Sequence, residues 1–297
     1  MRLHGSLMYL YTLNETERAM HDPNPGAEAG AELRAADNVV EPGLLVEERR
    51  RRICDLLQER GKVTVVALAR RFATSAVTIR ADLAALERAG ALVRSHGGAL
   101  PPREGLDQPL TVKETLHHAE KVRIARVAVS LIRDGETIIL DSGTTTAEIA
   151  KQIREAPLQS INVITNALNV AMLLASAPMV RLIMPGGILR RESNSLSGHI
   201  GEAALAELRA DRLFLGADAI DPKLGVMTPH LPEAHLNLKM IDIARQVVAV
   251  ADSSKLLRRN ISVIARVEQL DTLITDSAAP PAVIEELRRR GVDVLLA

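Results

Sequence analysis

The sequence predicts a protein of the α/β class with two domains, a small helical domain with a β-hairpin and then a parallel-sheet domain. The chain has 297 residues, 47% of them hydrophobic, which is enough for more than one core. Residues 46–100 contain three short amphipathic helical patterns followed by a Gly-Gly turn. Residues 119–297 alternate β-branched apolar runs with helical patterns, as strands of a parallel sheet do.

Residues 1–44 are expected to form a disordered extension. They show no sustained apolar periodicity and contain HDPNPGAEAGAE, which is rich in proline, glycine, alanine and acidic residues. No apolar run approaches the roughly 20 residues that span a bilayer, and no secretory signal is visible. Cys54 is the single cysteine, without a Cys or His cluster around it. We therefore expect a cytoplasmic protein with no membrane contact, no metal and no cofactor.

Residues 45–100 have the pattern of a winged helix-turn-helix domain. The helical segment EERRRRICDLLQER ends at Gly61, and VVALARRF follows Thr64, a favourable N-cap residue. The third segment, AVTIRADLAALERAG, follows Ser75, and the extended stretch LVRSHGGAL comes next. Residues 46–103 hold twelve Lys and Arg against six Asp and Glu, although the whole chain has a net charge of zero. A basic module on a neutral chain favours binding of a polyanion.

Duplex DNA is the expected polyanion, because only two Phe and two Tyr are present to stack unpaired bases. In a helix-turn-helix the third helix enters the major groove, and here Ile79, Leu83 and Leu86 are expected to face the core. For any single arginine, a solvated surface side chain is an equally good explanation. The predicted DNA-binding residues are Arg71, Ser75, Ala76, Thr78, Arg80, Arg94 and His96.

This segment resembles the DNA-binding module of the DeoR family of bacterial repressors. The shared patterns are S-x-x-T-I-R-x-D-L in the third helix and R-x-H-G-G in the hairpin. Many members carry arginine where this chain has Ala81, so one phosphate or base contact is expected to be missing. The resemblance implies that double-stranded operator DNA is a partner, and symmetric operators favour a homodimer or homotetramer.

A linker is expected over residues 101–118, and the sheet domain over residues 119–297. The apolar runs that predict strands are 137–140, 162–165, 180–184, 212–217, 247–251, 272–275 and 292–296. The first run leads into IILDSGTTTAEIA, where a small hydroxyl-rich loop opens into a helix. Free backbone N–H groups at such a helix start favour a phosphate. Glycine and threonine also make ordinary caps, but other strand ends carry polar residues too, and ligands of α/β sheets bind there.

From about Lys121 to the C-terminus, the chain resembles the effector domain of the DeoR family. The resemblance implies a fold similar to ribose-5-phosphate isomerase and a phosphorylated sugar or related metabolite as ligand. The segments TPHLPEAHLNLKM and ADSSK are most similar to the amino-sugar-related regulators. Glu233 fits a surface helix equally well. The predicted effector-binding residues are Asp141, Ser142, Gly143, Thr144, Thr145, Thr146, Asn166, Gly186, Gly187, Asp218, Glu233, Asp252 and Lys255.

The similarity to the isomerase also separates a sensor from an enzyme. In the isomerase an Asp and a Glu count among the catalytic groups, and this chain has Leu215 and Leu238 at the corresponding positions. Leucine cannot accept a proton, so we expect a repressor of carbohydrate-utilisation genes that is modulated by a phosphorylated sugar and is not an enzyme. The alternatives are an isomerase-like enzyme fused to a DNA-binding module, and a constitutive DNA-binding protein whose sheet domain serves only oligomerisation.

Overall fold

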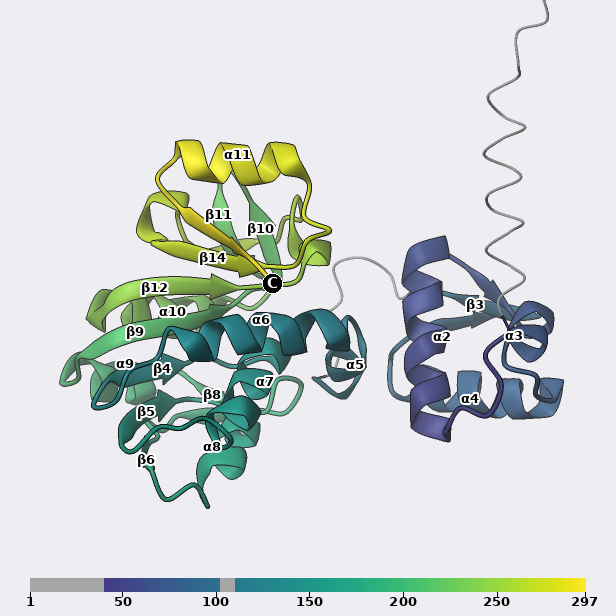
Figure 1. The fold of residues 1–297 in the computed structure, drawn as a ribbon, viewed down its shortest axis with the longest axis horizontal. Helices are drawn as coiled ribbons and strands as arrows, with labels where there is room; N and C mark the ends of the chain where they lie inside the picture. Colours follow the sequence, from purple (N-terminus) through teal and green to yellow (C-terminus); the bar gives the residue numbers. More distant parts are fainter. Residues whose placement is uncertain (1–39, 102–109) are drawn as a thin grey trace, which may run out of the picture.

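The protein forms two domains in the computed structural model, which describes residues 40–101 and 110–297 (Figure 1). The smaller domain is built from three helices and a short antiparallel sheet, and the larger one from a seven-stranded sheet with helices on both faces. The predicted fold class, a winged helix-turn-helix followed by a parallel-sheet α/β domain, is confirmed. Residues 1–39 of the predicted extension and 102–109 of the predicted linker lie outside the described residues.

The smaller domain folds as the apolar spacing of its sequence predicts. Its elements are α2 (Val46–Arg60), β1 (Val63–Thr64), α3 (Val65–Arg71), α4 (Ala76–Arg88), β2 (Val93–Ser95) and β3 (Gly98–Leu100). Thr64 and Ser75 cap α3 and α4, since their side-chain oxygens accept the N–H groups of Ala67 and Thr78. The three helices bury one shared core, which includes Ile53, Leu57, Leu68, Phe72, Ile79 and Leu83.

The wing of this domain depends on the second glycine of the R-x-H-G-G pattern. Strand β3 lies between β1 and β2 in an antiparallel sheet, with Thr64 opposite Gly98. A Cβ atom at Gly98 would lie 2.0 Å from the carbonyl oxygen of Val63. Only glycine therefore allows β3 to approach β1 so closely, which explains the residue type at this position.

The larger domain alternates strands and helices along the chain. Its helices are α5 (Leu110–Thr115), α6 (His118–Ser130), α7 (Thr144–Ile153), α8 (Leu168–Leu174), α9 (His199–Ala206), α10 (Leu231–Ile243) and α11 (Pro281–Arg289), with short 3₁₀ turns at Ser253–Lys255 and Val267–Gln269. The strands of its main sheet are β4 (Thr137–Leu140), β5 (Ile161–Thr165), β6 (Val180–Ile183), β9 (Ala210–Gly216), β12 (Ala244–Val250), β14 (Thr272–Thr275) and β15 (Asp293–Leu296).

All neighbouring strands of the main sheet are parallel, in the order β15-β14-β12-β9-β4-β5-β6. Side chains such as Ile138 and Phe214 pack with α6, α7 and α8 on one face, whereas Leu213 and Leu215 pack with α9, α10 and α11 on the other. Because both faces are covered, the central strands are mostly apolar, and the polar residues of β9 and β12, such as Arg212 and Gln246, lie in the first half of each strand. This is why the seven strands were recognisable as continuous apolar runs, and all seven predictions are confirmed.

The antiparallel parts of the larger domain were not predicted. Strands β7 (Ile188–Arg190) and β8 (Ser195–Ser197) form a hairpin after β6, and β10 (Ala219–Asp221), β11 (Gly225–Thr228) and β13 (Ser262–Ala265) form a small second sheet. The predicted linker also contains structure, because α5 lies within it. In the described part of the chain no helix is long and apolar enough to cross a membrane, and no cluster of His, Cys, Asp and Glu could hold a metal.

Candidate nucleic-acid interface and ligand pocket

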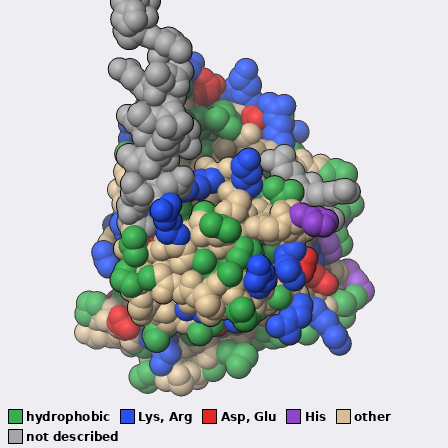
Figure 2. All heavy atoms as spheres, turned by 90° about the vertical axis from the view of Figure 1, so that its right-hand side faces the viewer, with side chains coloured by type: hydrophobic (Ala, Val, Ile, Leu, Met, Phe, Trp, Pro, Cys, Tyr) green, Lys and Arg blue, Asp and Glu red, His purple; other side chains and the backbone are tan. Residues whose placement is uncertain are grey.

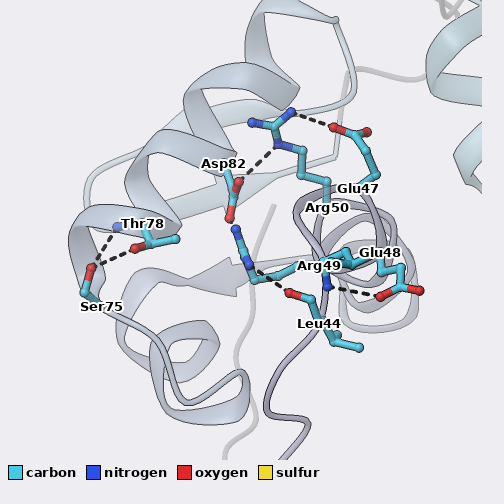
Figure 3. A network of polar contacts seen from close by, with 9 residues as sticks. Leu44, Glu47, Glu48, Arg49, Arg50, Ser75, Thr78 and Asp82 are labelled. Carbon is cyan, nitrogen blue, oxygen red and sulfur yellow. Dashed lines mark hydrogen bonds and ion pairs between the residues drawn. The ribbon is translucent and has the colours of Figure 1, made fainter.

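The exposed face of α4 is the candidate surface for DNA bases. Its inner face carries Ile79 and Leu83, both buried, while the Arg80 side chain and its neighbour Ala81 are exposed. The Thr78 hydroxyl is partly exposed and forms a 2.9 Å hydrogen bond with the hydroxyl of Ser75 (Figure 3). The predicted residues Ser75, Thr78 and Arg80 therefore lie together on the first turns of the helix that a helix-turn-helix places in the groove.

Ala76 of α4 lies differently from the prediction, and its neighbour Val77, for which no role was predicted, is exposed in its place. Ala76 packs against the domain core, and Val77 is 72% exposed. A helix turns by about 100° per residue, so Ala76 lies three residues before Ile79 on the buried face, and Val77 shares the outer face with Arg80. Sequence reasoning could have found this from the same spacing that identified the core. An exposed valine is suited to contact with a thymine methyl group.

The predicted place of Arg71 beside the duplex is corrected by the structure. Arg71 is only 8% exposed, and its Nη2 lies 2.6 Å from Oε1 of Glu41. The backbone N–H of Glu41 also donates to the carbonyl oxygen of Arg71 at 2.6 Å. This arginine therefore ties the segment before α2 to the end of α3. The guanidinium and the Arg52 side chain lower the pKa of Glu41 although burial raises it.

The wing carries two of the predicted DNA contacts, Arg94 and His96, and both are exposed. They lie on β2 and on the turn that follows it, where a wing can reach the sugar-phosphate backbone. On the face of the protein that carries this domain, Lys and Arg side chains are more frequent than Asp and Glu side chains (Figure 2). This excess of positive side chains agrees with the basic character predicted for the domain.

A buried carboxylate fixes α4 against α2. Asp82 Oδ2 lies 2.6 Å from Nε of Arg49, and Oδ1 lies 3.1 Å from Nε of Arg50 (Figure 3). Arg49 also donates to the carbonyl oxygen of Leu44, and Arg50 pairs with Glu47. The Asp82 side chain is 3% exposed, so the S-x-x-T-I-R-x-D-L pattern combines outward polar residues with one inward anchor.

The candidate ligand pocket lies where the order of the main sheet reverses. The chain runs from β4 outward to β6, then returns to β9 on the other side of β4 and continues outward to β15. The loops after β4 and β9 therefore diverge at this point, and ligands of open α/β sheets bind at such a crevice. The pocket lies there, with an empty volume of about 670 Å³ that includes space open to solvent.

The loop after β4 forms one wall of the pocket as predicted. Ser142, Gly143, Thr144 and Thr145 line it, and α7 starts at Thr144. The N–H groups of a first helical turn have no partners inside the helix, and they favour an anion. Close approach of β9 supports this loop, because a Cβ atom at Gly216 would lie 2.9 Å from the carbonyl oxygen of Ser142.

The pocket lining balances positive and negative charge. The ionisable residues that line it are Lys113, Lys121, Arg190, Glu192, Asp218, Glu233, Asp252 and Lys255. Two ion pairs cross the space, Lys113 Nζ to Asp218 Oδ1 at 2.8 Å and Arg190 Nη1 to Glu233 Oε2 at 2.9 Å. An anionic ligand in this pocket would compete with Asp218 and Glu233 for the positive charges of Lys113 and Arg190.

Burial shifts the pKa values of several pocket residues. Burial lowers the pKa of Lys121 to about 8, and it also lowers the pKa of Lys255 against the opposing effect of Asp252. Burial and the nearby Asp218 charge raise the pKa of Glu233, despite its pairing with Arg190. Burial would raise the pKa of Asp218, but Lys113, Lys255 and the hydrogen bond from Thr228 together hold that pKa below its usual value. Such perturbed groups in a cleft mark a candidate functional site.

The structure brings eight of the thirteen predicted effector residues to the pocket wall, and the other five lie behind it or elsewhere. Asp141 is 1% exposed and accepts a hydrogen bond from Asn237, and burial together with Glu233 raises its pKa well above the usual value. Thr146, Asn166, Gly186 and Gly187 also lie outside the lining of the pocket, and the roles predicted for them stay predictions. Thr146 and Asn166 bond to the backbone of Gly143 and Leu196, and a Cβ atom at Gly187 would lie 2.7 Å from the carbonyl oxygen of Ser197.

Sequence reasoning missed the pocket residues that come from outside the strand ends. Lys113 and Lys121 come from α5 and α6, and Arg190, Glu192 and Ser193 from the β7–β8 hairpin. No local motif marks them, since their relation to the loop after β4 exists only in the folded chain. Leu215 is fully buried in the core.

Comparison with known proteins agrees with this two-domain arrangement. Residues 49–104 match the DeoR-like helix-turn-helix domain, and residues 116–277 match the DeoR C terminal sensor domain. A protein of Escherichia coli O157:H7, provisionally named the aga operon transcriptional repressor, is 41% identical over 84% of this chain and 93% of its own length. The HTH-type transcriptional regulator GlpR of Haloferax volcanii is 36% identical over 85% of this chain and 98% of its own.

Among solved structures, ribose 5-phosphate isomerase A of Methanocaldococcus jannaschii is similar at 23% identity, over 46% of this chain and 53% of that one, with a TM-score of 0.35. The DNA-binding and sensor domains together define the chain as a transcriptional regulator rather than an enzyme. It belongs to the DeoR family.

Proposed function

We propose that this regulator is a cytoplasmic repressor of carbohydrate-utilisation genes and that a phosphorylated sugar, bound in the pocket after β4, changes its affinity for operator DNA. The observation that carries the proposal is the loop Ser142–Thr145, a helix start that faces lysine side chains across a pocket at the switch point of the sheet. The names of the two relatives, an operon repressor and a transcriptional regulator, support the DNA-binding part. As operators are commonly symmetric, the proposal includes a homodimer or homotetramer.

Mechanistically, phosphate contacts supply affinity for duplex DNA and the exposed face of α4 supplies sequence preference. A ligand can weaken or strengthen this binding only through different affinities for two conformations of the protein. The N–H groups at the start of α7 and the threonine hydroxyls would hold the phosphate, and the acidic residues Asp218 and Glu233 would accept hydrogen bonds from sugar hydroxyls.

Replacing Thr145 by valine should weaken the binding of phosphorylated sugars by about 10–150-fold, because a hydrogen bond to a charged group contributes about 1.5–3 kcal/mol. Thermal unfolding of the full chain, with and without a set of pentose and hexose phosphates, measures this as a smaller upward shift of the midpoint. Unphosphorylated forms of the same sugars serve as the ligand control. The matched control variant is Thr272→Val, because Thr272 begins β14 and so lies at the opposite end of the strands from the pocket. Equal protection by both ligand classes, with Thr145→Val like the parent, would remove the loop from the proposal.

The affinity for the phosphorylated ligand should fall as pH rises above about 8, the pKa of buried Lys121. A bound phosphate favours the ammonium form and raises this pKa. Below about pH 8 Lys121 is charged in both the free and the ligand-bound protein, so the affinity does not depend on pH through this residue. Above that value binding requires proton uptake, and the affinity falls by up to about 10-fold per pH unit.

Titration calorimetry from about pH 7 to 9.5 checks this dependence. A Lys121→Met variant should bind more weakly and show a shallower fall over the same range. A parent protein with constant affinity across the range would contradict the role of Lys121.

A further inference from the structure

Helix α5 belongs to the core of the DNA-binding domain although it follows that domain in the chain. Val112 is 2% exposed and Leu116 is 8% exposed, and both pack in the same apolar cluster as Cys54 and Leu57. Burial raises the pKa of the Cys54 thiol in this cluster to about 12. Interiors pack at crystal-like density, so a shift of α5 must be accommodated by α2 and the side chains around it.

The polar side of the same helix lies in the ligand pocket. Lys113 pairs with Asp218 at 2.8 Å, and both side chains line the pocket. Lys121, from α6, also lines the pocket and donates to the carbonyl oxygens of Lys113 and Leu116 at the end of α5. The backbone N–H of Leu110 donates to the carbonyl oxygen of Glu192 in the β7–β8 hairpin at 2.9 Å. The helix is therefore attached to the pocket by an ion pair and by backbone contacts.

From these contacts we propose that Lys113 is a ligand-binding residue carried on α5, and that occupancy of the pocket changes DNA binding by moving α5 against α2. This inference rests on the proposed function. A phosphate group, with a charge of about −1.5 to −2, competes with the Asp218 carboxylate for the Lys113 ammonium. It also attracts the Lys121 ammonium, which now holds the carbonyl groups of α5. One ligand thus acts on two of the three attachments of the helix, the ion pair of Lys113 and the contacts of Lys121.

The arrangement accounts for communication between the two sites through a short physical path. In the pocket, the Lys113–Asp218 ion pair of α5 is sensitive to a new charge, whereas the packing of Val112 against the core residues of α2 is apolar and insensitive to it. Figure 1 shows α5 on the side of the sheet domain that faces α2. Coupling free energies between two binding sites typically change the affinity at one site by about 5–150-fold. A movement of α5 would have to change the affinity for operator DNA by a factor in this range.

The test uses the full chain and a DNA duplex selected by that chain from random sequences. Fluorescence anisotropy gives the operator dissociation constant with and without saturating pentose or hexose phosphates, with inorganic phosphate as a further probe. Thermal unfolding reports whether each probe binds. The variants are Lys113→Met, which removes the charge, Lys113→Arg, which keeps it, and the control Lys239→Met on α10, whose exposed side chain pairs with Asp242 outside the pocket.

For the parent, we expect saturating ligand to change the operator dissociation constant by about 5–150-fold. For Lys113→Met, ligand at saturation should change this constant by less than about 2-fold. Lys113→Arg and Lys239→Met should keep the change seen in the parent. Ligand should also speed amide hydrogen exchange in α5 of the parent. A full response by saturated Lys113→Met overturns the inference and leaves the proposed function standing. A parent chain that binds no probe, or binds one without any change in operator affinity, overturns the proposed function and this inference with it.

Discussion

Replacing Asp82 by alanine should destabilise the DNA-binding domain by about 3 kcal/mol, because loss of one partner leaves a buried charge uncompensated. Asp82 is 3% exposed and holds Arg49 and Arg50 through its two oxygen atoms (Figure 3). The Arg49 side chain is 11% exposed and cannot recover full hydration. The Arg50 side chain is 28% exposed, which places the expected loss at the lower end of the range for buried pairs.

Amide hydrogen exchange of the full chain measures this loss locally, as faster exchange in α2 and α4 with little change in the main sheet. Glu47→Ala is the matched control, since it removes an exposed carboxylate from the same Arg50 and should cost no more than about 1 kcal/mol. Asp82→Asn keeps one acceptor oxygen, so its loss of stability should lie between the losses of Asp82→Ala and Glu47→Ala. Exchange in α4 of Asp82→Ala at the parent rate would show that the carboxylate contributes nothing.

The architecture was predictable because its strongest signals are local and periodic. A strand covered on both faces is mostly apolar, as β4 is from Ile138 to Leu140, and that leaves a continuous apolar run in the sequence. The helix caps Thr64 and Ser75 are equally local. The hairpin formed by β7 and β8 gave no such signal, because Ile188 and Leu189 are exposed and its strands have three residues each.

The candidate pocket was only half predictable, for a related reason. The loop after β4 is a contiguous motif, and polar residues after β9 and β12 follow from the rule that parallel strands end at one edge. Lys113 reaches the same pocket from a helix that precedes the sheet, so its role depends on packing that no spacing rule describes. Arg71 was predicted to contact DNA because it is a basic residue close to the helix α4. In the structure it pairs with Glu41, which the sequence spacing did not indicate.

Replacing Arg80 by alanine should weaken operator binding by about 5–150-fold, since a bidentate contact to guanine contributes about 1–3 kcal/mol. The side chain is exposed on the outer face of α4 beside Thr78, and Ser75 holds the first turn of the helix in place. If Arg80 reads a base, the loss must be larger on the selected duplex than on a scrambled one. If it only contacts phosphate, both duplexes must lose affinity alike, and the salt dependence of binding must decrease by about one ion.

The control for this prediction is Arg88→Ala, which removes an exposed arginine from the last turn of the same helix, where Nε donates to the carbonyl oxygen of Ala84. It changes the net charge of the domain by the same amount as Arg80→Ala, so any difference between them reflects position rather than charge. Fluorescence anisotropy at two salt concentrations on both duplexes separates the base and phosphate explanations. Identical isotherms for the parent and Arg80→Ala would mean that the outer face of α4 does not enter the groove, and the wing residues Arg94 and His96 would then have to supply the recognition.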